Sequence, residues 1–127
     1  MNMVVRAVDV GYGHVKFTEG YDELGAIVAE SFPSQSVISP KSQHQSMVWQ
    51  QRDTFHIPIG DRLHEVGRGI RFAMSGNQET EVLDRDFCLS DAYRSRLLGA
   101  LSYMAPRLPK DRIDFLVLGL PLTTYLM

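Results

Sequence analysis

One stretch of the chain decides the interpretation of its fold: Asp9-Val10-Gly11-Tyr12-Gly13-His14-Val15-Lys16-Phe17. It continues an apolar run that begins at Val4, and such near-continuous apolar character predicts a strand buried on both faces. A carboxylate at the end of a buried strand is costly unless it faces a cation, a metal or hydrogen-bond donors. Glycines let the backbone turn sharply and approach a ligand closely. The stretch therefore predicts a strand–turn–strand phosphate loop, with Lys16 on phosphate and Asp9 near a metal.

Two better-known phosphate motifs are excluded by this sequence. A P-loop needs a glycine, four further residues and then Gly-Lys-Ser/Thr, and the chain contains no such string. A dinucleotide fingerprint needs a third glycine, opening a helix, where Lys16 stands in a segment that alternates like a strand. The alternative that stays open is a tight hairpin turn with a surface lysine, because Gly-x-Gly turns are common.

The two ends of the chain resemble a known family. The aspartate, the two glycines and the lysine of residues 9–16 resemble the first phosphate loop of the superfamily of actin, heat-shock chaperones and sugar kinases. The other end resembles bacterial actin-like plasmid-segregation proteins of the ParM/StbA type. There, a strand runs into Gly119-Leu120-Pro121-Leu122-Thr123-Thr124-Tyr125. Within that group, the N-terminal residues resemble the D proteins of PRTRC plasmid systems. The middle of the chain, about 33–88, carries no motif of this family.

This resemblance implies a cytoplasmic ATPase that polymerises to segregate plasmid DNA and uses ATP or GTP with Mg²⁺. Asp9 would be the catalytic and metal-binding residue, holding Mg²⁺ through water. Backbone donors of Gly11, Tyr12 and Gly13 would cradle phosphate, and Lys16 would contact it directly. Positioning and electrostatic stabilisation would provide most of the phosphoryl transfer to water. The implied partners are further copies in a filament and plasmid DNA through an adaptor only, with no membrane.

The chain is shorter than the family pattern. In the family, a second phosphate loop, the residue that positions the attacking water and the adenine site all follow the segment that matches Tyr125, whereas this chain stops at Met127. We therefore expect the first lobe only, without ATPase activity of its own. We also expect self-association as a dimer or larger species, because a strand at 115–120 that is apolar on both faces would lack cover.

Composition fits one globular domain without a nucleic-acid surface. The 127 residues have a formal net charge of −2, and the basic residues are scattered rather than arranged in a stripe. No apolar run approaches the length of a transmembrane helix, and the first residues lead us to expect no secretory signal. The single cysteine, Cys88, cannot form an internal disulfide, and the four histidines match no metal-ligand spacing.

The order of the predicted elements indicates an α/β fold with a mixed sheet. Strands at 3–10, 14–20 and 24–32 form an antiparallel meander with short connections. After a helix, a central strand at 113–120 returns parallel to the first strand, and a right-handed crossover places the two side by side. By resemblance, this is the N-terminal lobe of the actin-like (ribonuclease H-like) fold.

The helix is predicted between the N-cap Ser90 and Pro106, which ends it. Its spacing predicts that Arg94, Ser95 and Ser102 lie largely off the apolar face. The residues predicted to form that face are Tyr93, Leu97, Leu98, Ala100, Leu101 and Met104.

Between the two core segments, 1–33 and 88–127, we predict an inserted small β subdomain at about 34–87. Edge strands that tolerate proline are typical of such an insertion. The sequence favours a plain loop over a second anion-binding turn at 67–69. The predicted short strands are 47–49, 54–59 and 63–67, and the predicted solvated loop is 74–86.

Two other classes of function remain open from the sequence. The chain would be a non-catalytic interaction module if the glycine turn is only a hairpin and the exposed sheet binds a partner. It would be one lobe of a sugar or acetate kinase if it belongs to another branch of the superfamily, although the Gly-Leu-Pro-Leu-Thr run at 119–123 argues against that branch.

Overall fold

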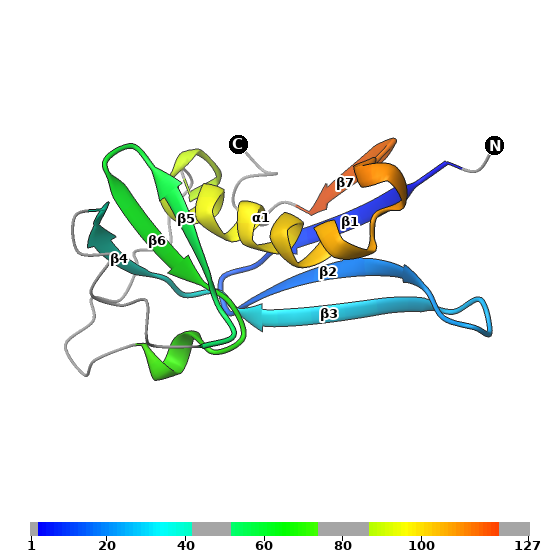
Figure 1. The fold of residues 1–127 in the computed structure, drawn as a ribbon, viewed down its shortest axis with the longest axis horizontal. Coiled ribbons are helices and arrows are strands. Elements are labelled where there is room, and N and C mark those ends of the chain that lie inside the picture. Colours follow the sequence, from blue (N-terminus) through cyan, green and yellow to red (C-terminus); the bar gives the residue numbers. More distant parts are fainter. Residues whose placement is uncertain (1–2, 42–51, 74–86, 120–127) are drawn as a thin grey trace.

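The computed structural model describes residues 3–41, 52–73 and 87–119, which form two β-sheets and one long helix (Figure 1). The larger sheet has the strand order β3-β2-β1-β7. Its strands are β1 (Val5–Val10), β2 (His14–Tyr21), β3 (Ile27–Pro33) and β7 (Phe115–Gly119). The smaller sheet has the order β4-β6-β5 and consists of β4 (Val37–Pro40), β5 (Phe55–Ile59) and β6 (Arg62–Val66).

The mixed character of the larger sheet confirms the predicted fold class. Strands β1, β2 and β3 pair antiparallel, and β7 pairs parallel to β1 with Val5 opposite Phe115 and Asp9 opposite Gly119. Two details of the prediction were wrong. The third strand begins at Ile27 rather than at 24, because the connecting turn is longer. Among the described residues, β7 is also an edge strand rather than a central one.

The helix α1 (Asp91–Met104) begins where the sequence predicts. The Ser90 hydroxyl accepts a hydrogen bond from the Tyr93 N–H at 3.1 Å, which satisfies one of the free donors of the first turn. A 3₁₀ turn that contains Pro106 follows Met104. The described 3₁₀ turns are Ile70–Phe72, Phe87–Leu89, Ala105–Arg107 and Pro109–Asp111.

The buried face of α1 differs from the predicted one. Ser95, Arg96 and Gly99 are buried, whereas Leu98 is exposed. The reason is that α1 packs on both sheets, so small side chains are needed where it comes close to strands. A Cβ at Gly99 would lie 2.6 Å from the Val66 Cγ2 atom of β6. The buried residues of the helix are Tyr93, Ser95, Arg96, Gly99, Ala100, Tyr103 and Met104.

The smaller sheet matches the predicted strands at 54–59 and 63–67, but β4 was not predicted. That strand lies in a stretch of low hydrophobic content and ends at Pro40, which suits an edge strand. The predicted strand at 47–49 and loop at 74–86 lie outside the described residues, and the bounds of the insertion stay a prediction. One apolar core joins the two sheets through α1, because Ile57 and Val66 belong to the same cluster as Val8 and Met104.

An ion pair joins the buried Glu65 of β6 to the partly buried Arg52. The Glu65 carboxylate is buried and accepts hydrogen bonds from Arg52 Nε and Nη2, both at 2.8 Å, and from the Thr54 hydroxyl at 2.6 Å. Burial alone would raise the pKa of Glu65, but the hydrogen bonds and the charge of Arg52 outweigh it and lower that pKa. The charged form of Glu65 therefore stabilises the folded chain.

We predict that Glu65→Gln lowers the free energy of unfolding at neutral pH by about 3 kcal/mol, because it leaves Arg52 partly buried without its counter-charge. The contribution of Glu65 is present above its ordinary pKa of 4.5 and declines as pH falls through the lowered folded value. Denaturant unfolding should therefore show the gap between the two proteins narrowing below pH 4.5. Glu30→Gln, at an exposed pair with Arg68, serves as the control and should change little. A gap of constant size at all pH values would contradict this assignment.

Candidate functional site

The glycine turn between β1 and β2 is tight and tied to the end of β3. The Gly11 N–H donates to the His14 carbonyl at 3.0 Å, and a Cβ at Gly11 would lie 3.0 Å from that same oxygen. The Ser34 N–H donates to the Gly13 carbonyl at 2.9 Å. The turn therefore has a fixed shape at one end of the sheet, where β1 ends and β2 begins.

Asp9 and Lys16 lie directly opposite each other across β1 and β2. Both side chains are exposed and point away from the face that packs on α1, because Val8, Val10, Val15 and Phe17 alternate with them and are buried. The sequence-predicted carboxylate and lysine thus meet on one open face of the sheet, beside the glycine turn.

Gly119 is a site residue that the sequence analysis did not identify. It lies opposite Asp9 on β7, and a Cβ there would lie 2.8 Å from Asp9 Oδ1 and 3.1 Å from Asp9 Cγ. Any larger residue would displace the carboxylate from its position. The available signal was a glycine at the end of an apolar strand, which often marks a close approach of another group.

A shallow hollow of about 440 Å³ lies on this open face. Asp9, Lys16 and Gly119 line one end of it, and Thr18 and Val117 are among the residues that continue it along the sheet. Only the end at Asp9 coincides with the predicted phosphate site, and the rest is a surface of small and apolar side chains.

The three residues of the turn contribute differently. The half-buried Tyr12 ring packs against Phe87 with 5.3 Å between ring centroids, so we expect its backbone rather than its ring to contact a ligand. A Cβ at Gly13 would have no atom within 4 Å, which leaves room for close approach. The Gly11 N–H is engaged within the turn, and a phosphate would have to compete with His14 for it.

The described histidines and the second glycine turn do not add to this site. His14 is exposed on β2, and the described residues contain no cluster of three or more potential metal ligands from His, Cys, Asp and Glu. In the turn at 67–69, the Arg68 N–H donates to the Tyr103 hydroxyl and the Gly69 N–H donates to the Asp53 carbonyl. These donors are already used, which supports the plain-loop interpretation. Thr123 and Thr124 lie outside the described residues.

Comparison with known proteins agrees with this architecture. Residues 7–127 match the family model of the N-terminal domain of actin-like proteins. A crystal structure of the apo psk41 parM protein shares the fold, with a TM-score of 0.60 and 16% sequence identity over 95% of this chain. The chain covers 37% of the length of that protein. No curated protein matches the chain significantly.

The mixed sheet, with Asp9 and Lys16 beside its glycine turn, and the match to the family model together identify an N-terminal lobe of the actin-like fold. The chain belongs to the actin-like protein family, and its fold is that of the corresponding lobe of ParM. Within the part of the chain that the structure describes, no helix is long and apolar enough to cross a membrane.

Proposed function

We propose that this chain is the nucleotide-binding lobe of an actin-like ATPase that polymerises for plasmid segregation. The observation that carries the proposal is the meeting of Asp9 and Lys16 on one open face beside the glycine turn, with Gly119 leaving space for the carboxylate. A plain hairpin needs neither the carboxylate nor the glycine that accommodates it. Family membership and the ParM fold support the same function.

The residues at this site fit a nucleotide phosphate with Mg²⁺. Magnesium is usually held by one or two carboxylates, several waters and substrate phosphates, so the single carboxylate of Asp9 suffices on the protein side. The metal would neutralise charge that develops during phosphoryl transfer. Lys16 would contact a phosphate oxygen as a point charge, and the backbone of Gly11, Tyr12 and Gly13 would lie against it. In this proposal Asp9 and Lys16 position and stabilise, and neither acts as a nucleophile.

The wider setting is also a proposal. Cytoplasmic location, filament formation with further copies, contact with plasmid DNA only through an adaptor and the choice between ATP and GTP all rest on family membership and the likeness to ParM. Two further proposals are based on the sequence alone: the similarity to D proteins of PRTRC systems and the bounds 34–87 of the inserted subdomain.

Binding of nucleotide to the ¹⁵N-labelled chain, followed by NMR, tests the proposal. With ATP and Mg²⁺, amide shifts are expected at Tyr12, Gly13 and Lys16. Adenosine is the matched control without phosphates and should leave these amides unchanged. Absence of chemical-shift changes at the turn, or equal changes with adenosine, would mean that the turn is a plain hairpin that does not bind phosphate. The chain alone should show no ATP turnover above background.

Gly119→Ala provides a further prediction. The new Cβ would push the Asp9 carboxylate aside, and we expect the Mg²⁺-dependent part of nucleotide affinity to fall about tenfold, which corresponds to about 1.4 kcal/mol. Stability should change little, because the clash is with the end of an exposed side chain. Calorimetric titration with and without Mg²⁺ measures the effect. In an Asp9→Ala background the same substitution should cause no further loss, and a full additional loss would show that Gly119 acts independently of Asp9.

A further inference from the structure

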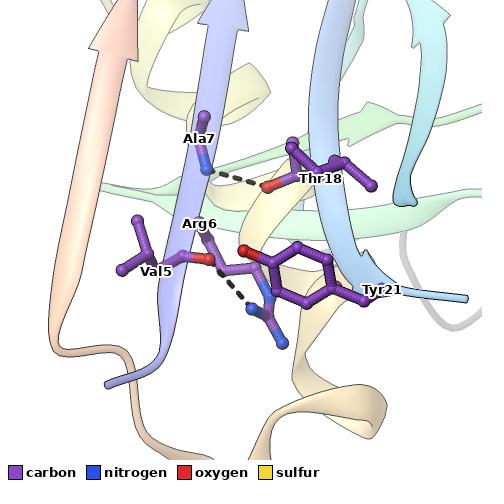
Figure 2. Close-up of a pocket in the computed structure, with 7 residues that line it drawn as sticks. Val5, Arg6, Ala7, Thr18 and Tyr21 are labelled. Carbon is purple, nitrogen blue, oxygen red and sulfur yellow. Dashed lines mark hydrogen bonds between the residues drawn. The ribbon is translucent and has the colours of Figure 1, made fainter. Parts of the chain in front are cut away.

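At the end of the larger sheet remote from the glycine turn, β1 and β2 separate. Their backbone pairing covers Val8 to Val10, and before it the Ala7 N–H donates instead to the Thr18 hydroxyl at 2.9 Å. The pairing of β2 with β3 is irregular between Thr18 and Gly20. A gap therefore opens between the two strands, and Figure 2 shows the Arg6 side chain lying in it.

The guanidinium of Arg6 is buried in this gap, with only 7% of the residue exposed. Its Nη1 donates to the Val5 carbonyl at 2.9 Å, and its Nη2 lies beside Gly20, where a Cβ would be 3.4 Å away. Its Nε is buried and has no hydrogen-bond partner among the described residues. A buried guanidinium whose donors are incompletely used retains the capacity to bind an acceptor.

No described carboxylate lies within ion-pair distance of Arg6. The acidic residue of the neighbouring strand segment, Glu19, instead accepts a hydrogen bond from Arg107 at 2.9 Å. A buried charge without a counter-ion costs free energy, and a carboxylate that entered the gap would remove this cost. The geometry therefore favours an anionic occupant over a neutral one.

The space beside Arg6 is a pocket of about 120 Å³. Typical sites for small molecules occupy roughly 300–1,000 Å³, so this pocket suits one side chain better than a metabolite or a nucleotide. Tyr21 and Ile27 stand at its rim with 69% and 64% of their surfaces exposed. The pocket is lined by Val5, Arg6, Ala7, Thr18, Gly20, Tyr21 and Ile27 (Figure 2).

We propose that this pocket is a docking site for an acidic side chain, flanked by apolar residues, of a protein partner. The carboxylate would accept from Arg6, and the flanking apolar groups would cover Tyr21 and Ile27. Tyrosine and arginine are among the residue types that dominate binding energy at protein interfaces. The site lies on the same sheet as Asp9 and Lys16 but at its other end, so it does not depend on nucleotide binding.

NMR titration of the ¹⁵N-labelled chain with a short peptide tests this proposal. The probe is acetyl-Leu-Glu-Leu-amide, and its control is the same peptide with glutamine in place of glutamate. The acidic peptide should cause saturable amide shifts at Val5, Tyr21 and Ile27, and the glutamine peptide should bind at least tenfold more weakly. Butyrate serves as a free carboxylate and should also bind at least tenfold more weakly than the acidic peptide. Equal binding of the two peptides, or butyrate binding as tightly as the acidic peptide, would overturn the proposal.

A second experiment does not rely on removing Arg6 alone, which fills space in the sheet. Ile27→Glu places a carboxylate at the rim, and we expect it to raise the melting temperature relative to Leu24→Glu, a matched change at the hairpin tip where Leu24 is 93% exposed. The advantage should disappear when Arg6→Met is added to both variants. If Ile27→Glu is no more stable than Leu24→Glu, or if its advantage survives loss of Arg6, the pocket does not receive carboxylates.

Discussion

Replacing Lys16 with alanine is expected to weaken nucleotide binding ten- to a hundred-fold in a protein that contains this lobe. A hydrogen bond to a charged group contributes about 1.5–3 kcal/mol, and each tenfold change in affinity corresponds to about 1.4 kcal/mol. Lys16 is exposed and forms no ion pair among the described residues. Its removal should therefore leave the fold intact, and the loss would report on the ligand contact.

Isothermal calorimetry with ATP and Mg²⁺ measures this loss. Lys41→Ala is the matched control, because it removes the same charge from an exposed position in a different part of the chain. Asp9→Ala should chiefly remove the Mg²⁺ dependence and slow hydrolysis in the larger protein. Unchanged affinity in the Lys16 variant would mean that the turn is a hairpin with a surface lysine.

The features of this fold that follow from local chemistry were predictable. The alternation of β2, the Ser90 cap and the apolar run that becomes β7 each depend on neighbouring residues in the sequence. The parallel pairing of β1 with β7 followed from the strand–helix–strand order. The position of Asp9 opposite Lys16 depends on local sequence as well, since a short turn sets the register of a hairpin.

The features that depend on distant parts of the chain were not predictable. The buried face of α1 is set by its contacts with both sheets. Gly99 and Arg96 are therefore buried, although hydrophobic periodicity alone predicts that leucines such as Leu98 are buried instead. The proximity of Gly119 to Asp9 arises only when β7 lies beside β1. The half-buried Tyr12 ring contacts Phe87, which is remote in sequence, and so it packs against the core. In each case the sequence predicts the element, and tertiary packing decides which side chain matters.

The largest effect on stability is expected at Gly67, where the backbone has a φ of +141° and three groups lie close. A Cβ there would be 2.6 Å from the Tyr103 hydroxyl oxygen, 2.8 Å from the Asp53 carbonyl oxygen and 2.8 Å from Thr54 Cα. The Tyr103 hydroxyl cannot move freely, because it donates to Asp53 Oδ1 at 2.9 Å and accepts from the Arg68 N–H at 3.0 Å. Burial and the hydrogen bond to Asp53 raise the pKa of Tyr103, so this hydroxyl keeps its proton and remains a donor.

Gly67→Ala should therefore lower the free energy of unfolding by about 3–7 kcal/mol, since overpacking costs about 1–3 kcal/mol, a side chain held in a sparsely populated φ region about 1–3 kcal/mol and a lost hydrogen bond about 1 kcal/mol. Small domains are stable by only about 5–15 kcal/mol, so a large part of the total is removed. Gly60→Ala is the control for a glycine of positive φ without crowding, because Gly60 has a φ of 62°, in the left-handed α region, and no atom within 4 Å of its Cβ position. Denaturant unfolding should show a loss of about 1–2 kcal/mol for this control, as the backbone penalty alone requires. Equal losses in the two variants would mean that the close contacts of Gly67 with Tyr103, Asp53 and Thr54 yield without cost.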